Sequence, residues 1–239
     1  MQPHSAMILA AGLGTRMRPL TLDRPKPLVE VAGRTLLDRA LDAARAAGVG
    51  RAVVNVHYLA DQIENHLETC DMETFVSDER DVLMDSGGGV VRAMPHLGDD
   101  PFFILNSDTF WRESHPPAAL RAMSDLLDDA ADMVLLLARR EDAVGFDGRG
   151  DFHLDEGRPR RRGDDPTAPF VYAGAILARP AVFADAPSGP FSLNLTFDEA
   201  IGTGRMRAHV LDGLWLHVGT PQAIPLAEEA LALWEERAA

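Results

Sequence analysis

The sequence predicts an α/β fold with a mixed, mostly parallel central sheet and helices on both faces. Three observations lead to this prediction: apolar runs alternate with amphipathic segments through the N-terminal half, residues 102–106 are an almost unbroken apolar run, and a glycine-rich turn follows the first apolar run. Strands that alternate with helices pair in parallel through right-handed crossovers. Ligands of such sheets bind beyond the carboxyl ends of the strands, so functional residues are expected there.

In the N-terminal half, residues 7–10 are expected to form the first buried strand. A helix is expected after Thr35, whose hydroxyl suits an N-cap, and it should stop at Gly48. Strands are also expected at residues 52–56, 73–77 and 102–106, and a short helix at residues 61–67.

The C-terminal half is less regular. Four strands are expected there, at residues 131–140, 170–178, 207–211 and 214–218. A further short strand is expected near Phe152. An amphipathic helix is expected from the segment 191–198 onward. The last helix should open at Gly219 to Pro221, with Thr220 as N-cap and Pro221 in the first turn.

Composition excludes several classes of partner. The 239 residues carry a net charge of −14, which disfavours nucleic acid and anionic membrane surfaces. The one cysteine, Cys70, has no partner for an internal disulfide, and no apolar run approaches the length of a membrane span. These features predict a soluble cytoplasmic protein, either a monomer or a small homo-oligomer.

The turn after the first strand has the composition of a phosphate-binding loop. Gly12 and Gly14 let backbone N–H groups approach an anion closely. Arg16 offers a planar fork for phosphate oxygens, and Lys26 offers a compact charge. Lys26 is the only lysine among 23 basic residues, and the flanking prolines Pro25 and Pro27 hold it on an extended arm. The turn therefore predicts an anionic, phosphate-bearing ligand.

Two common phosphate loops do not fit the turn. The pattern GxxxxGK[ST] is absent, and Met17 stands where a dinucleotide loop needs its third glycine. Residues 9–33 instead match the pattern LAAGxGTRxxPLTxxxPKPLxxVxG throughout. In this the chain resembles the sugar-phosphate nucleotidyltransferase family. The resemblance implies a Rossmann-like fold in a single domain over residues 1–239, with a nucleotide-binding half over about 1–115 and a small sugar-binding lobe over about 116–239.

The resemblance also implies site residues. Catalysis would fall to Arg16 and Lys26, together with Asp108 at the end of the strand 102–106. The nucleotide would contact the first turn, the DSGGG segment and the end of that strand, at Leu9, Ala10, Ala11, Gly12, Gly14, Thr15, Lys26, Ser86, Gly87, Gly88 and Asn106. The sugar phosphate would meet Gly150, Arg160, Tyr172, Gly174 and Asn194. Arg161 and Arg162 share the basic run with Arg160, and Asn194 suits an N-cap equally well.

A divalent cation is implied at Asp108, because a carboxylate at the end of a central strand can hold Mg²⁺ against phosphate oxygens. Related enzymes carry a second aspartate before the sequence VGT, where this chain has His217. Imidazole favours Mn²⁺ and other transition ions over Mg²⁺. Three interpretations stay open: His217 ligates the metal, it contacts phosphate directly, or it is a core histidine while Asp108 and the triphosphate hold one Mg²⁺.

The implied reaction joins a nucleoside triphosphate to a sugar-1-phosphate and releases pyrophosphate. Among members of the family, the chain length and the DSGGG, GDF and VGTP segments favour UTP and N-acetylmuramate-1-phosphate, and with them a role in peptidoglycan recycling. The alternatives are guanylyl transfer to mannose- or heptose-1-phosphate, cytidylyl transfer to phosphocholine, and a nucleotide-sensing domain without catalysis.

Overall fold

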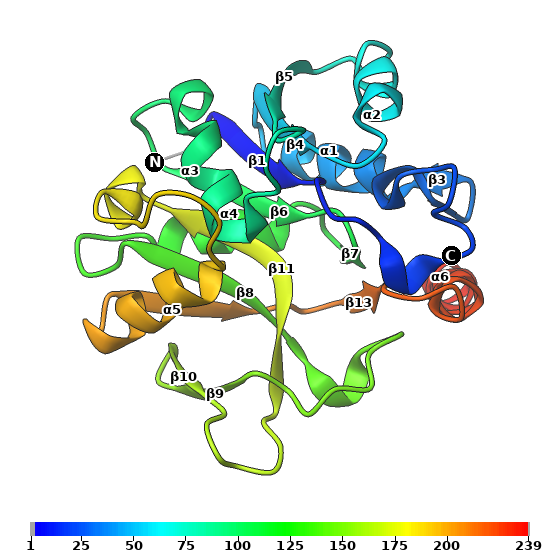
Figure 1. The fold of residues 1–239 in the computed structure, drawn as a ribbon. Coiled ribbons are helices and arrows are strands. Elements are labelled where there is room, and N and C mark those ends of the chain that lie inside the picture. Colours follow the sequence, from blue (N-terminus) through cyan, green and yellow to red (C-terminus); the bar gives the residue numbers. More distant parts are fainter. Residues whose placement is uncertain (1–2, 239) are drawn as a thin grey trace.

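A computed structural model describes residues 3–238, and its centre is a twisted nine-stranded sheet (Figure 1). Four neighbouring strands run parallel in the order β6-β1-β4-β5, namely β1 (Ser5–Leu9), β4 (Arg51–Val56), β5 (Glu73–Asp78) and β6 (Phe102–Asn106). Because these strands are parallel, their carboxyl ends lie at one edge of the sheet.

The other five strands make the sheet mixed. β11 (Phe170–Ala178) runs antiparallel to β6 on one side and to β8 (Met133–Arg139) on the other. β12 (Met206–Val210) pairs in parallel with β8. β9 (Phe152–Asp155) and β10 (Arg158–Arg161) form an antiparallel hairpin beside the start of β11. The predicted mixed, mostly parallel sheet is confirmed.

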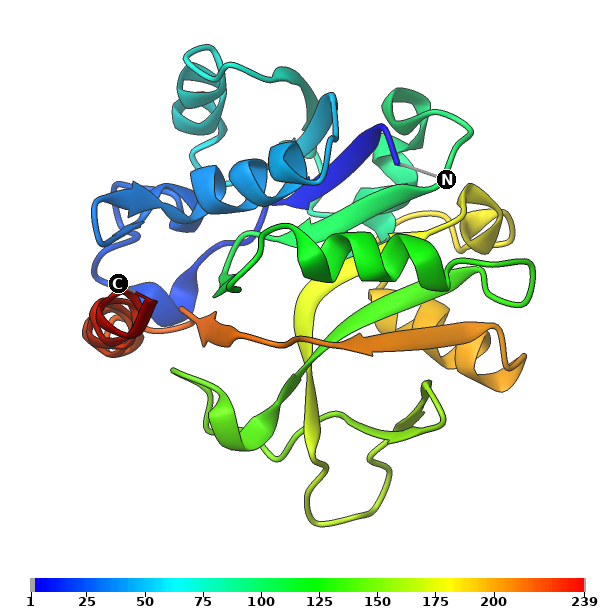
Figure 2. The same cartoon turned by 180° about the vertical axis from the view of Figure 1, so that it is seen from behind.

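Helices cover both faces of the sheet. In Figure 1, α3 (Asp85–Leu97) and α5 (Leu193–Gly202) lie on the near face, and the reverse view in Figure 2 shows α1 (Leu36–Ala46) and α4 (Ala118–Leu126) on the other. Each face has its own buried apolar cluster. Two further helices, α2 (Ala60–Leu67) and α6 (Ala223–Ala238), lie at the periphery. None of the helices formed by residues 3–238 is long and apolar enough to span a membrane.

Two short ladders complete the fold. β2 (Glu30–Val31) pairs with β3 (Arg34–Thr35), and β7 (Thr109–Arg112) pairs with β13 (Leu214–His217). The second ladder positions the site, since it sets Thr109 opposite His217 and the N–H of Val218 donates to the carbonyl of Asp108 at 2.8 Å. The segment before VGT therefore lies directly beside the end of β6.

Several local predictions are confirmed. β6 and β11 have the predicted bounds, and Thr35 caps α1 by accepting a hydrogen bond from the N–H of Asp38 at 3.0 Å. Others are wrong. The last helix begins at Ala223 rather than at Pro221, and Ser192 rather than Asn194 is the N-cap of α5. Two residues of the basic run, Arg160 and Arg161, lie in β10, for which no strand was expected.

Candidate active site

A cavity of about 600 Å³ opens beyond the carboxyl ends of β1, β4 and β6. Most of the residues assigned to nucleotide binding or catalysis line it, namely Leu9, Ala10, Ala11, Gly12, Gly14, Thr15, Arg16, Lys26, Ser86, Asn106 and Asp108. Its volume is in the range of small-molecule sites. The signature turn and the end of β6, remote in sequence, thus meet in one hollow.

The glycine-rich turn leaves backbone donors free. The N–H groups of Gly12 and Gly14 donate to no acceptor among residues 3–238. Gly14 has a φ of +62°, a conformation that glycine adopts without strain. The N–H of Ala10 is different, because it donates to Asn55 Oδ1 at 2.7 Å. The turn can therefore cradle an anion through its glycines, while Ala10 anchors it to β4.

Lys26 and Asp108 form the charged centre of the cavity. Lys26 Nζ lies 2.8 Å from Asp108 Oδ2, and the two side chains are 13% and 26% exposed. Burial of the Asp108 carboxyl raises its pKa, but the Lys26 ammonium, with help from His217 and Arg16, lowers it more. The net pKa of Asp108 is below that of an ordinary aspartate, so Asp108 is a carboxylate at neutral pH.

His217 belongs to the same centre. Its Nδ1 lies 3.2 Å from the carbonyl oxygen of Gly145, and its ring stacks on Trp215 at 6.1 Å between centroids. Gly219 is closely packed against it: a Cβ atom at position 219 would lie 2.9 Å from His217 Nε2 and 3.5 Å from Arg16 Nη1. His217 and Arg16 therefore both lie next to Gly219, which lines the cavity, although His217 itself does not line it.

Asn55 and Glu79 are functional candidates that the sequence did not single out. Asn55 Nδ2 donates to Glu79 Oε1 at 2.7 Å, and the N–H of Met84 donates to Glu79 Oε2 at 2.9 Å. Both side chains are buried and both line the cavity. Each residue lies at or just beyond the end of a parallel strand. A polar residue at that position in the sequence is a signal for a ligand-binding role.

Two glycines of the DSGGG segment lie away from the cavity. Gly87 and Gly88 lie inside α3, do not line the cavity, and donate their N–H groups to the carbonyl of Phe191 at 2.8 and 3.1 Å. A Cβ at position 87 would lie 2.4 Å from the Phe191 ring, so close packing explains this glycine. Ser86 lines the cavity, but its hydroxyl accepts the N–H of Leu193 at 3.0 Å.

The residues assigned to the sugar phosphate do not line this cavity. Arg160 is exposed and faces Asp155 and Asp165 at 3.9 and 3.7 Å. Arg161, rather than Arg160, contacts Asn194, through a 2.9 Å hydrogen bond to its Oδ1. Arg162 donates to the carbonyl oxygens of Gly150, Gly163 and Asp165.

The other three sugar-side positions belong to the sheet and its loops. A Cβ at Gly150 would meet the carbonyl oxygen of Ala168, and one at Gly174 would meet Thr109 Oγ1, so packing requires both glycines. Burial raises the pKa of Tyr172, and the Asp108 charge adds to this. The Tyr172 hydroxyl is thus protonated and has no hydrogen-bond partner among residues 3–238.

Comparison with known proteins shows the family to which the chain belongs. Residues 6–184 match the model of the MobA-like NTP transferase domain. The chain belongs to this family of nucleotidyltransferases. It is 45% identical to the N-acetylmuramate alpha-1-phosphate uridylyltransferase of Caulobacter vibrioides, over 96% of this chain and 98% of that protein. It is 30% identical to the protein of the same name from Neisseria meningitidis serogroup B, over 96% and 99% of the two chains.

Solved structures confirm the nucleotidyltransferase fold. The inositol-1-phosphate CTP transferase from T. maritima superimposes with a TM-score of 0.81, over all of this chain and 99% of that one, at 20% sequence identity. Identity at that level supports the fold and not the substrate. The predicted Rossmann-like nucleotidyltransferase architecture is confirmed.

Proposed function

We propose that this nucleotidyltransferase transfers the uridylyl group of UTP to N-acetylmuramate-1-phosphate, giving the UDP-sugar and pyrophosphate. The cavity in which the turn glycines meet Arg16, Lys26 and Asp108 supports nucleotidyl transfer. The choice of base and sugar rests on one observation, the 45% identity to the Caulobacter vibrioides uridylyltransferase over nearly the whole of both chains. With these substrates the enzyme would act in cytoplasmic peptidoglycan recycling.

In the proposed reaction an oxygen of the sugar-1-phosphate attacks the α-phosphorus of UTP. The new P–O bond forms as the bond from the α-phosphorus to the bridging oxygen breaks, and pyrophosphate leaves with that oxygen. The attacking phosphate is already anionic, so no protein nucleophile is needed. The protein must align two polyanions and neutralise their repulsion, and positioning with electrostatic stabilisation supplies the rate.

Each residue of the cavity has a separate role in this reaction. Gly12 and Gly14 present free N–H groups to the triphosphate. Arg16 stabilises the charge that develops on pyrophosphate, and Lys26 neutralises the α-phosphate during transfer. Asn55 holds the start of the turn to β4 through the N–H of Ala10. The buried Asn55–Glu79 pair therefore keeps the turn in shape without contacting the reacting atoms.

The donor set also fits a divalent cation. Asp108 is an ionised, partly exposed carboxylate at the cavity wall, and His217 adds an imidazole beside it. These two residues would hold the ion, and Mg²⁺ or Mn²⁺ bound there would neutralise phosphate charge. The ammonium of Lys26 lies against the same carboxylate, so Lys26 also limits how much further positive charge Asp108 accepts.

A pyrophosphate-release screen tests the proposal. Each of the four nucleoside triphosphates is offered with a panel of sugar-1-phosphates, first with Mg²⁺ and then with Mn²⁺. The highest kcat/KM is expected for UTP with N-acetylmuramate-1-phosphate. A preference for GTP with mannose- or heptose-1-phosphate, or for CTP with phosphocholine, would contradict the substrate assignment, and nucleotide binding without turnover would indicate a sensor.

A further inference from the structure

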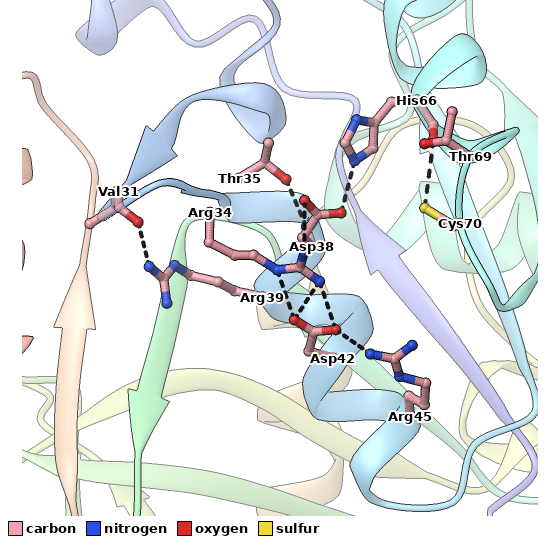
Figure 3. A network of polar contacts seen from close by, with 10 residues as sticks. All are labelled: Val31, Arg34, Thr35, Asp38, Arg39, Asp42, Arg45, His66, Thr69 and Cys70. Carbon is pink, nitrogen blue, oxygen red and sulfur yellow. Dashed lines mark hydrogen bonds and ion pairs between the residues drawn. The ribbon is translucent and has the colours of Figure 1, made fainter. Parts of the chain in front are cut away.

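Three side chains with different donor atoms converge on the side of α1 that faces α2. Asp38 lies in the first turn of α1, His66 in the last turn of α2, and Cys70 just beyond α2 (Figure 3). One carboxylate oxygen, one imidazole nitrogen and one sulfur all lie within 4.8 Å of one another. In residues 3–238 this is the one group of three or more such donors that approach so closely. None of the three lines the nucleotide cavity.

We propose that Asp38, His66 and Cys70 form a Zn²⁺ site, separate from the proposed active site. The ligating atoms are Asp38 Oδ1, His66 Nε2 and Cys70 Sγ. Carboxylate oxygen, imidazole and thiolate are the three ligand types that Zn²⁺ takes in proteins, and three protein ligands with one open position are a common arrangement.

Distances support a single ion. Three atoms that lie within 4.8 Å of one another share a point at most about 2.8 Å from each. Bonds of about 2.0–2.3 Å to Zn²⁺ therefore need only sub-ångström shifts of the side chains. At present His66 Nε2 and Asp38 Oδ1 are joined by a 2.8 Å hydrogen bond, which holds both ligands in facing positions. Zn²⁺ would replace the shared proton between them.

The groups around the three ligands leave the ligating atoms available. The other oxygen of Asp38 lies 3.9 Å from Arg34 Nη1, while Arg34 makes its short contacts, of 2.8 to 3.0 Å, with Asp42 (Figure 3). Arg34 is thus neutralised mainly by Asp42 and does not need Asp38 Oδ1. Arg34 would orient the coordinated carboxylate by attracting its other oxygen, as polar groups next to metal ligands do.

Metal binding at Cys70 would break only one weak hydrogen bond. Its thiol makes one weak contact, at 3.6 Å, to the carbonyl oxygen of His66. That carbonyl also accepts from the N–H and the hydroxyl of Thr69, at 3.1 and 2.7 Å. When the thiol proton leaves on metal binding, the carbonyl keeps two donors. The three ligands line a cavity of about 360 Å³, which gives the ion access from solvent.

A bound ion would connect α1 and α2, and through α2 the signature segment. Tyr58, just before α2, donates its hydroxyl to the carbonyl of Thr21 at 3.0 Å, and Gln62 donates to the carbonyl of Asp23 at 2.8 Å. Residues 21–23 lead directly to Lys26. Zn²⁺ binding should therefore stabilise the fold next to the active site without contacting a substrate.

Co²⁺ added to the metal-free chain tests the site, because a thiolate bound to Co²⁺ gives an intense near-ultraviolet charge-transfer band. The chain has one cysteine, so this band can arise only at Cys70. We expect the band to saturate with one Co²⁺ at Cys70 and to disappear on addition of Zn²⁺, and we expect Zn²⁺ to raise the Tm of the wild type more than that of Cys70→Ser. Absence of the band at millimolar Co²⁺ would overturn the proposal, whatever the outcome of the substrate screen.

Variants separate ligation from nonspecific binding. Cys70→Ser should abolish the band, and His66→Gln and Asp38→Asn should weaken Co²⁺ binding by at least tenfold. The matched control is His96→Gln, since His96 is exposed and stacks on Phe75 away from the cluster. Equal Co²⁺ affinity in His66→Gln and His96→Gln would show that the imidazole of His66 is not a ligand and would contradict the proposed three-residue site.

Discussion

Lys26 Nζ lies 2.8 Å from Asp108 Oδ2, although 82 residues separate the two in the chain. The pair brings the only ammonium side chain to the end of the central strand β6, in a protein with net charge −14. The substrates of a nucleotidyltransferase are polyanions, which the net negative charge of the protein repels. Local positive charge at the site is therefore needed to attract them. The pair also keeps Asp108 ionised and able to hold a cation.

The first prediction concerns Lys26. Lys26→Ala removes the charge that we propose neutralises the α-phosphate, so kcat should fall by about 10²–10³-fold, as it does when another transition-state donor is removed. Pyrophosphate release under saturating substrates measures this. Arg24→Ala is the control, because Arg24 is exposed, does not line the cavity and should leave the rate near that of the wild type. Near-normal turnover of Lys26→Ala would remove Lys26 from the mechanism.

The second prediction concerns pH. Since the folded-state pKa of Asp108 is depressed, its ion pair with Lys26 contributes fully above the unfolded pKa of about 3.8 and is lost as the pH falls through the folded pKa. The difference in unfolding free energy between wild type and Asp108→Asn should thus be constant near neutrality and shrink in acid. Urea denaturation of metal-free protein across pH measures it. A difference that grows in acid would contradict the sign of the pKa shift.

The third prediction concerns the support of the turn. Asn55→Ala leaves the N–H of Ala10 and one oxygen of Glu79 without partners, and each buried orphan costs about 1–3 kcal/mol. The unfolding free energy should fall accordingly, and KM for the nucleotide should rise because the turn loosens. Asn65→Ala is the control, because Asn65 is exposed on α2. Equal urea midpoints for the two variants would show that the Asn55 bridge contributes nothing.

Local signals in the sequence predicted much of the fold. The apolar runs of β6 and β11 and the cap at Thr35 depend on neighbouring residues, and the structure has them as expected. The signature segment likewise pointed to Arg16 and Lys26, and the apolar strand 102–106 pointed to Asp108. These three residues line one cavity. These features are predictable because periodicity, capping and loop chemistry are properties of short segments.

The sequence did not predict features that depend on contacts between residues far apart in the chain. Gly87 and Gly88 were assigned to contact with a base, and nothing in the sequence indicated that Phe191 and Gly189 pack against them from a distant part of the chain. The Asn55–Glu79 pair is visible only once β4 and β5 are known to be neighbours. Spacing in a sequence carries no record of such partners, so contacts between remote segments are the least predictable part of the candidate site.

The fourth prediction tests the packing of His217. In Gly219→Ala the new Cβ would lie 2.6 Å from His217 Cε1, so the imidazole has to move while the backbone stays in place. We expect a lower kcat with little change in Tm. Gly202→Ala is the matched control, because a Cβ there meets nothing within 4 Å. If both variants keep wild-type kcat, the position of the imidazole does not matter to the reaction.

The last prediction concerns the choice of metal ion if His217 is a ligand. His217 directly precedes Val218, whose N–H donates to the carbonyl of Asp108. His217→Asp replaces a nitrogen donor by a hard carboxylate, so the ratio of activity with Mg²⁺ to activity with Mn²⁺ should rise several-fold.

His217→Ala separates ligation from phosphate contact. If the imidazole ligates the ion, the concentration of metal needed for half-maximal rate rises while KM for the sugar phosphate changes little. If the imidazole donates to phosphate, KM changes and the metal titration does not. Metal titrations at fixed substrate, run on wild type and both variants, distinguish the two roles, and an unchanged titration in His217→Ala would exclude His217 as a ligand and leave Asp108 and the triphosphate to hold the ion.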